Sequence, residues 1–128
     1  MCQHSHHAVN ALLEAYVDII RSGEQYPAPI LEIRTLPQPP TPDHKATGKL
    51  LLSIPLDPST IYPEGLTIPQ VVSTVSGKMN WARLYNRDGK TIVDYSITEF
   101  DRGGDIEVTS LELVDGQTVH LPVIGLTI

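Results

Sequence analysis

Hydrophobic positions follow two different periods, one before residue 23 and another after it. In the segment AVNALLEAYVDIIRS, residues 8–22, apolar side chains recur at three- and four-residue spacing. This spacing places them on one stripe of a helix. Gly23 follows as a helix stop, and Ser5 or Asn10 can cap the start. The pattern therefore predicts one amphipathic helix with a single apolar stripe: Val9, Leu12, Leu13, Tyr16, Val17 and Ile20.

After Gly23 the apolar residues come in short runs, several of them alternating with polar residues, and turn residues separate the runs. The 11 prolines all follow Gln25 and exclude a further long helix. Asp88-Gly89 and Asp115-Gly116 predict tight hairpin turns, because glycine accepts positive φ without steric cost. Seven strands are predicted, at residues 30–36, 49–54, 70–75, 79–86, 91–98, 106–113 and 117–128.

One helix followed by about seven short strands is typical of a mainly β protein. Regular spacing with turn chemistry between strands favours a β-sandwich of jelly-roll or Greek-key kind. We therefore expect a single domain over residues 1–128, with a flexible leader at 1–7, a helix at 8–23 and the sandwich at 30–128. Two proline-containing segments are expected as long loops of the sandwich: residues 37–48 and 55–69.

Charge and cysteine content narrow the classes of function. Fifteen acidic against nine basic residues give a formal net charge of −6, which repels phosphate backbones, so no nucleic-acid partner is expected. Cys2 is the only cysteine, so no intrachain disulfide can form, in keeping with assembly in a reducing host cytoplasm. No apolar run approaches the ~18 residues of a membrane span, and no secretory signal is apparent. A soluble protein with no membrane partner is expected.

The N-terminal leader contains the strongest candidates for metal ligands. Cys2, His4, His6 and His7 carry the thiol and imidazole groups that bind zinc. A structural zinc site needs four ligands held at defined turns, whereas these four lie close to a chain end, where order is usually poor. A flexible polar leader is the favoured interpretation. The segment DRGGD, residues 101–105, lacks the ligand spacing of a calcium loop and favours a plain turn. We expect no metal and no other cofactor.

No pattern typical of catalysis stands out. The chain has no Gly-x-Ser-x-Gly elbow and no phosphate-binding glycine loop. Four carboxylates lie close together in sequence, at Glu99, Asp101, Asp105 and Glu107. Sequence cannot place two of them across a groove, as glycoside hydrolysis would require, and a solvated acidic edge is favoured. We therefore expect that the protein is not an enzyme and assign no catalytic residue.

Trp81 has two interpretations. A tryptophan buries roughly 200 Å², so it can anchor a core that has few other aromatic residues. It can instead be an interface hot spot, where Trp, Tyr and Arg are enriched. Arg83 and Tyr85 share its strand face by alternation, which makes that face partly polar. The core anchor is favoured, and the interface interpretation stays open.

The order of the segments over about residues 10–128 adds a resemblance. The features, in order, are Gly23 after the helix, Leu50–Leu52, Trp81, Arg83, Asp88-Gly89, Asp105 and the DGQTV run at 115–119. In this order the chain resembles a group of small structural proteins of tailed bacteriophages and prophages. It departs from them in its histidine-rich leader and at residues 57–70, where the group is usually rich in Gly and Ala. The resemblance implies a virion component with no known activity.

The role expected from this resemblance is that of a capsid decoration, or cement, protein. Such a protein would lie on the exterior of the virion and stabilise the head by binding between subunits of the major capsid protein. Self-association, as a dimer or trimer at a symmetry axis, is also expected. Candidate interface residues lie in the two proline-containing loops: Tyr62, Leu66, Ile68, Pro40 and Pro42.

Two other roles remain open. One is a structural component of the tail, neck or baseplate. The other belongs to a different class, a module that binds carbohydrate on the host surface through exposed Trp81, Tyr85 and Tyr95.

Overall fold

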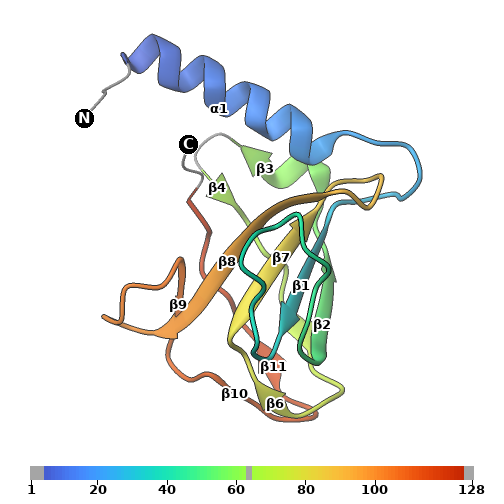
Figure 1. Cartoon of the computed structure of the whole chain (residues 1–128), viewed down its shortest axis with the longest axis vertical. Coiled ribbons are helices and arrows are strands. Elements are labelled where there is room, and N and C mark those ends of the chain that lie inside the picture. Colours follow the sequence, from blue (N-terminus) through green and yellow to red (C-terminus); the bar gives the residue numbers. More distant parts are fainter. Residues whose placement is uncertain (1–4, 63–64, 126–128) are drawn as a thin grey trace.

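The computed structural model describes residues 5–62 and 65–125. This part of the chain is mainly β, with one N-terminal α-helix, which confirms the predicted fold class in outline (Figure 1). The helix α1 spans His6–Arg21, and a single 3₁₀ turn, η1, spans Pro58–Thr60. Eleven strands are described: β1 Ile30–Arg34, β2 Leu50–Pro55, β3 Ile61–Tyr62, β4 Gly65–Leu66, β5 Val71–Val72, β6 Gly77–Lys78, β7 Trp81–Tyr85, β8 Thr91–Glu99, β9 Ile106–Val108, β10 Glu112–Leu113 and β11 Thr118–Val119.

The helix begins two residues earlier than predicted. Of the two candidate caps, Ser5 is used, and its side-chain oxygen accepts a hydrogen bond from the Ala8 backbone N–H at 3.1 Å. His6 and His7 therefore belong to the helix rather than to a leader, while residues 1–4 lie outside the described part of the chain. After Ser22, Gly23 turns the chain with φ +120°. Over the described residues no helix has the length and apolar character to cross a membrane.

The largest element is a five-stranded sheet in the order β2-β1-β7-β8-β9. Strands β2, β1, β7 and β8 pair antiparallel, and β9 pairs with β8 in parallel. The Asp88-Gly89 turn joins β7 to β8 as predicted, with Gly89 at φ +76°. Pairing of β1 with β7 brings together segments about fifty residues apart in the chain, which no local pattern specifies.

The remaining strands form three two-stranded ribbons: β10 with β6, β11 with β5, and β3 with β4. The strand predicted at 106–113 is divided between β9 and β10, which pair with different partners. The segment 55–69, predicted as a loop, contains η1, β3 and β4. These differences arise because each two-residue segment is fixed by its pairing partner, and a two-residue strand leaves almost no periodic signal in the sequence.

One apolar core lies between the sheet, the ribbons and α1. Alternation along the strands points Leu31, Ile33, Ala82, Leu84 and Tyr95 to this core. The ribbons and the helix supply the other side: Val17, Ile20, Ile61, Leu66, Ile68, Leu113, Val119 and Ile124. This core is mostly aliphatic. The side chains that alternate with these on β1, β7 and β8 face the other side of the sheet.

Candidate functional site

The face of the sheet that points away from the aliphatic core, here called the outer face, carries a row of polar side chains. Strand register aligns Ser53 on β2, Glu32 on β1, Arg83 on β7 and Asp94 on β8. The four residues share one row because each occupies a matching position in the antiparallel pairing. Opposite charges directly across neighbouring strands stabilise such a row.

Arg83 is the centre of this row. Its guanidinium binds Asp94 with two hydrogen bonds, Nε to Oδ1 at 2.7 Å and Nη2 to Oδ2 at 3.0 Å. The side chains of Arg83 and Asp94 are only 2% and 5% exposed. The hydrogen bonds to Asp94 raise the pKa of Arg83, and they outweigh the opposite effect of burial. A buried bidentate pair of this kind fixes geometry strongly, since neither charge has water as an alternative partner.

Trp81 is fully buried, but it lies on the outer face and not in the aliphatic core. The Arg83 guanidinium carbon stands 5.3 Å from the centre of its ring system, within cation–π range. The Trp81 indole N–H donates to the Thr35 carbonyl at 2.8 Å. Trp81 thus anchors a second, smaller packed layer, formed where the segment after β1 contacts the outer face of the sheet.

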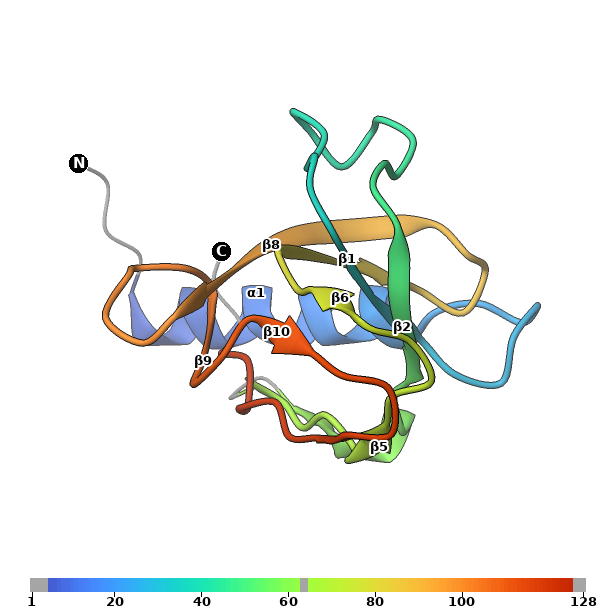
Figure 2. The ribbon, with the colours of Figure 1, turned by 90° about the horizontal axis from the view of Figure 1, so that it is seen from below.

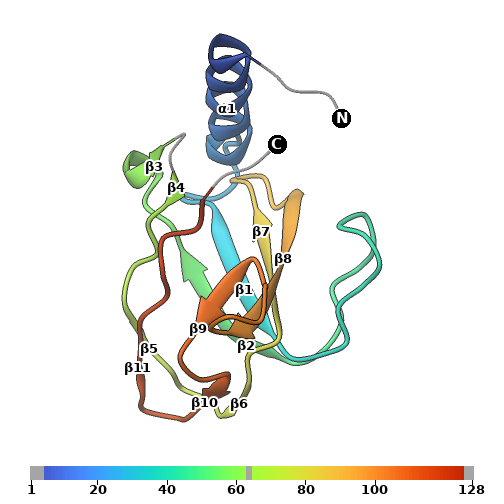
Figure 3. The same ribbon diagram turned by 90° about the vertical axis from the view of Figure 1, so that its left-hand side faces the viewer.

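Residues 37–48, called the proline arm from here on, stand out from the outer face (Figures 2 and 3). Arg83 Nη1 donates to the carbonyl of His44 at 2.6 Å, so the buried arginine holds the arm directly. At the base, Thr35 and Lys49 exchange two hydrogen bonds, Thr35 N–H to the Lys49 carbonyl at 3.0 Å and Lys49 N–H to Thr35 Oγ1 at 2.8 Å. The predicted proline-rich loop is therefore a fixed projection.

The arm encloses a shallow hollow of about 400 Å³. It is lined mainly by the prolines and by the aliphatic parts of polar side chains: Pro37, Gln38, Pro39, Pro40, His44, Lys45 and Thr47. Within the arm, Thr41 Oγ1 and His44 Nδ1 lie 2.8 Å apart, in hydrogen-bond contact. The hollow offers an apolar concave surface with little conformational freedom.

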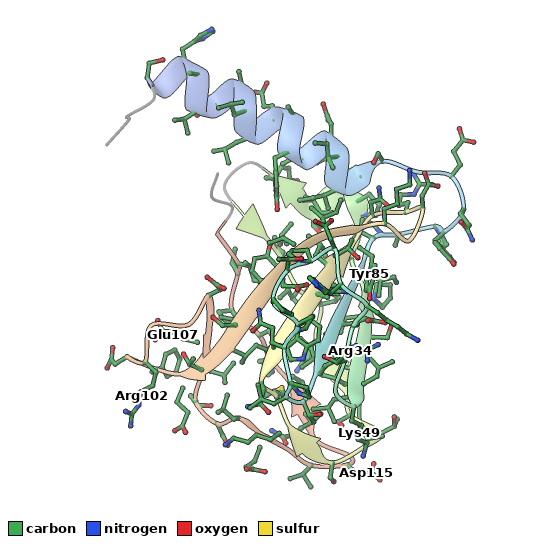
Figure 4. All side chains as sticks on the ribbon, viewed as in Figure 1. Arg34, Lys49, Tyr85, Arg102, Glu107 and Asp115 are labelled. Carbon is green, nitrogen blue, oxygen red and sulfur yellow. The ribbon has the colours of Figure 1, made fainter. Side chains whose placement is uncertain are left out.

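A second hollow of about 210 Å³ lies on the outer face of the sheet, lined by Tyr26, Ile30, Glu32, Ser53, Tyr85, Asn86 and Gly89. Tyr85 donates its hydroxyl to Glu32 Oε1 at 3.0 Å, and Arg34 contacts the same oxygen at 3.2 Å. Burial raises the pKa of Tyr85, and its hydrogen bond to Glu32 acts in the same direction. Figure 4 shows Tyr85 and Arg34 along the middle of the sheet.

The predicted interface residues are divided by the fold. Pro40 is exposed and Pro42 half-buried on the proline arm, and Tyr62 is 53% exposed on β3. Leu66 and Ile68 are 0% and 9% exposed and pack in the aliphatic core. The expectation that these two residues contact a partner needs correction, because Leu66 in β4 and Ile68 just after it are covered by other residues of the protein itself.

The two predicted contact loops also face opposite ways. Figure 3 places the proline arm on one side of the sheet and β3 on the other. Tyr62 lies next to α1, where it lines a hollow of about 400 Å³ together with Glu14, Val17, Asp18 and Arg21. The guanidinium of Arg21 donates to the Ile61 carbonyl and holds the end of α1 to β3. The loops therefore form two separate surfaces.

The residues considered for metal binding or catalysis do not assemble into a site in the described part of the chain. No group of three or more His, Cys, Asp or Glu side chains there could hold a metal ion, and Cys2 and His4 lie outside it. Of the carboxylates near β9, Asp105 Oδ2 accepts the Ser96 N–H at 2.9 Å, and Glu99 and Asp101 are exposed. Figure 4 shows Glu107 and Arg102 at this end of the sheet.

Comparison of the chain with protein-family models, with curated proteins and with solved structures gives no match.

Trp81, Tyr85 and Tyr95, the three aromatic residues expected to bind carbohydrate, do not form one exposed surface. Trp81 is covered on the outer face, and Tyr95 lies 7% exposed in the aliphatic core, on the other side of the sheet. Tyr85 is left on the outer face with Tyr26, a residue that the sequence analysis did not single out.

The alternation of Trp81, Arg83 and Tyr85 along the sequence did indicate a partly polar face of the sheet. The pairing of Arg83 with Asp94 could have been found by aligning the two strands around the Asp88-Gly89 turn.

Proposed function

We propose that this protein is a capsid decoration, or cement, protein of a tailed bacteriophage, which binds on the outside of the head between major capsid subunits. The observation that carries the proposal is the proline arm, held in place on the outer face by its hydrogen bond from Arg83 and by the hydrogen bonds between Thr35 and Lys49 at its base. Proline presets φ, so an arm that is already ordered loses little further entropy when it docks. The resemblance to phage structural proteins supports the same role.

The placement of two exposed surfaces supports binding between subunits rather than to one subunit. The arm presents Pro40 and Pro42 on one side, and β3 presents Tyr62 on the other. A small rigid body with contact surfaces on opposite sides can join two neighbours in a shell. An exposed tyrosine is among the residue types most enriched at interface hot spots.

The proposal includes a finer description of the architecture, a two-layer β-sandwich of jelly-roll or Greek-key kind. It is supported by the packing of the three ribbons across the aliphatic core from the five-stranded sheet. Aliphatic side chains from both layers meet in that core, as in sandwich folds.

The test uses expanded empty capsids of the phage or prophage that encodes the chain. Purified protein should co-sediment with these capsids at a fixed ratio and raise their melting temperature. Tyr62→Ala, and separately a Pro40→Ala/Pro42→Ala double variant, should weaken binding by about tenfold or more. Phe100→Ala is the matched control, since Phe100 is 57% exposed but lies on the turn between β8 and β9.

Three outcomes would contradict the proposal. Wild-type protein that leaves capsids unchanged is not a cement protein. Binding to isolated tails or necks in place of heads would favour the tail, neck or baseplate alternative. Loss of capsid binding in Phe100→Ala, with none in the Tyr62 and proline variants, would place the contact surface elsewhere.

Carbohydrate binding is a second candidate, and the hollow between Tyr26 and Tyr85 favours it. Two tyrosine rings and the Glu32 carboxylate combine apolar faces with a hydrogen-bond acceptor, as sugar rings require. NMR titration with host-surface polysaccharide should then shift signals of residues around this hollow, and Tyr26→Ala should abolish the shifts. Absence of shifts at millimolar sugar would remove this candidate.

A further inference from the structure

The helix α1 has more apolar surface than its own fold covers. Val17 and Ile20 are 3% and 0% exposed and pack in the aliphatic core. Leu12 and Ile19 are 41% and 51% exposed, although both are large and apolar. At about 100° per residue, Leu12 and Ile19 lie on one line along the helix, roughly a third of a turn from the docked side. A second apolar face is therefore left open in the described structure.

This second face has the spacing of a helix-pairing seam. Ala8, Leu12, Ala15 and Ile19 follow one another at intervals of four, three and four residues. That is the heptad spacing of positions that meet across two packed helices. The seam, defined by these four residues, contains no charged side chain, and small and large residues alternate along it.

We propose that the seam packs against the same seam of a second copy of this protein, with the two helices antiparallel about a twofold axis. The axis would pass between residues 13 and 14. Leu12 would then oppose Ala15 of the partner subunit, and Ile19 would oppose Ala8 of the partner subunit. Each large side chain meets a small one, which is how facing helix positions interdigitate at native density. A parallel pair would oppose Leu12 to Leu12 and Ala15 to Ala15, and would leave a gap at each alanine.

Charge favours the same arrangement. Antiparallel helices place the positive end of one macrodipole beside the negative end of the other. Asp18 is the charged residue nearest the seam on its outer border, and the twofold axis places it beside Ala11 of the partner subunit, not beside another carboxylate. The chain carries a net charge of −6, so an interface that avoids acidic pairs limits repulsion between copies.

The size of the contact sets the expected strength. A helix of 16 residues is about 24 Å long, so two such helices bury less than the ~1,200 Å² at which stable interfaces begin. We therefore expect a weak, transient dimer with a Kd on the order of tens to hundreds of micromolar. In Figure 3, α1 lies at one end of the molecule, with the strands on one side of it. This self-association goes beyond the proposed function, and its test needs no capsid.

The first test exchanges side-chain size across the seam and measures self-association by sedimentation equilibrium. Ala15→Leu adds apolar surface, yet it should raise the dimer Kd by about tenfold or more, because two leucines would collide. Leu12→Ala should weaken the dimer as well, and the double variant Leu12→Ala/Ala15→Leu should restore it. Asn10→Leu is the matched control, since Asn10 is exposed on α1 but lies outside the seam. Circular dichroism verifies that each variant keeps its helix.

The second test fixes the direction of the pair by disulfide formation in a Cys2→Ser background. An oxidised mixture of Leu12→Cys and Ala15→Cys proteins should give mainly the mixed dimer, identified by mass. A Leu12→Cys homodimer as the main product would show a parallel pair and overturn the proposal. Monomer at every concentration together with no cross-link above the level of Asn10→Cys would overturn it too. Capsid binding by a strictly monomeric protein would leave the proposed function standing without this interface.

Discussion

At the residue scale, Arg83 decides how the outer face of the sheet is organised. One guanidinium binds a carboxylate on the neighbouring strand, lies over the ring of Trp81 and donates to the carbonyl of His44. These contacts join the sheet to the proline arm through a group that is almost inaccessible to water. An arginine suits this place because its five N–H donors are fixed in one plane.

Replacing Arg83 by alanine should be among the most destabilising substitutions in this chain. The substitution leaves the Asp94 carboxylate buried without its partner, which typically costs ~3–5 kcal/mol of unfolding free energy. Urea unfolding would measure the loss. Arg83→Lys is the control that keeps the charge and loses the two-point contact, and it should cost less. A loss under ~1 kcal/mol in Arg83→Ala would mean that the pair adds little to stability.

Asp88 links the β7–β8 turn to the segment after the helix in a pH-dependent way. Its carboxylate accepts the backbone N–H groups of Glu24 at 2.9 Å and Gln25 at 3.3 Å, and these bonds lower the pKa of Asp88. A carboxyl group whose pKa is lower in the folded state stabilises the fold above its ordinary pKa, near 3.8, and this contribution is lost as the pH falls through the folded value.

Asp88→Asn should therefore lower the melting temperature at pH 7, and the difference from wild type should shrink as the pH is lowered below about 4. Thermal unfolding followed by circular dichroism between pH 2.5 and pH 7 measures this. Asp115→Asn is the control, since Asp115 heads the other Asp-Gly turn and uses its backbone N–H, not its carboxylate, for a hydrogen bond. If Asp88→Asn lowers the melting temperature as much at pH 3 as at pH 7, the lowered pKa of Asp88 is not the cause of its stabilising effect.

At the scale of elements, the proline arm depends on how its two ends meet. Gly48 closes the arm with φ +81°, and a Cβ atom added there would overlap the carbonyl of Thr35. Gly116 has a similar backbone, φ +87°, but a Cβ added there meets no atom within 4 Å. Substituting each glycine by alanine therefore separates two free-energy costs, that of the left-handed backbone conformation and that of steric overlap.

Gly116→Ala should cost about 1–2 kcal/mol of unfolding free energy, the strain of an alanine in the left-handed region. Gly48→Ala should cost clearly more, because the base of the arm must open to relieve the overlap. Denaturant unfolding of both variants gives the comparison. Equal losses would mean that the arm closes without the tight approach of Gly48 to Thr35.

At the scale of the whole molecule, one sheet serves two packed layers. Its inner face contributes Leu31, Ile33 and Leu84 to the aliphatic core, and its outer face carries Trp81 beneath residues 35–48. Strand β7 takes part in both layers, because successive residues point to opposite faces. Loss of either layer would expose the side of β7 that this layer covers.

This arrangement predicts a single unfolding transition seen by two probes. Trp81 is the only tryptophan, so its fluorescence reports the outer layer, while circular dichroism reports the strands and helix. In wild-type protein the two urea transitions should coincide. In Gly48→Ala the fluorescence change should begin at a lower urea concentration than the dichroism change. Separate transitions in wild type would indicate that the arm opens independently of the sheet.

The chain determines by itself those features that depend on neighbouring residues. The apolar spacing of residues 8–22 specifies α1, Ser5 supplies its cap, and Gly23 ends it. Asp88-Gly89 specifies the β7–β8 hairpin, and alternation along β7 indicates a mixed face with Trp81, Arg83 and Tyr85. Each of these follows from backbone preferences that act over a few residues.

Tertiary structure alone decided which face each apolar segment meets. Leu66 and Ile68 resemble interface residues in the sequence, but Leu66 pairs with β3 and bridges to Ile124, and both side chains are buried in the core. Leu12 belongs to the same stripe as Val17 in the sequence, yet it stays exposed. The hydrogen bond from Arg83 to His44 on the proline arm joins residues 39 positions apart. Such contacts form when long loops close around a shared core. Local periodicity does not indicate which distant segment packs at each position.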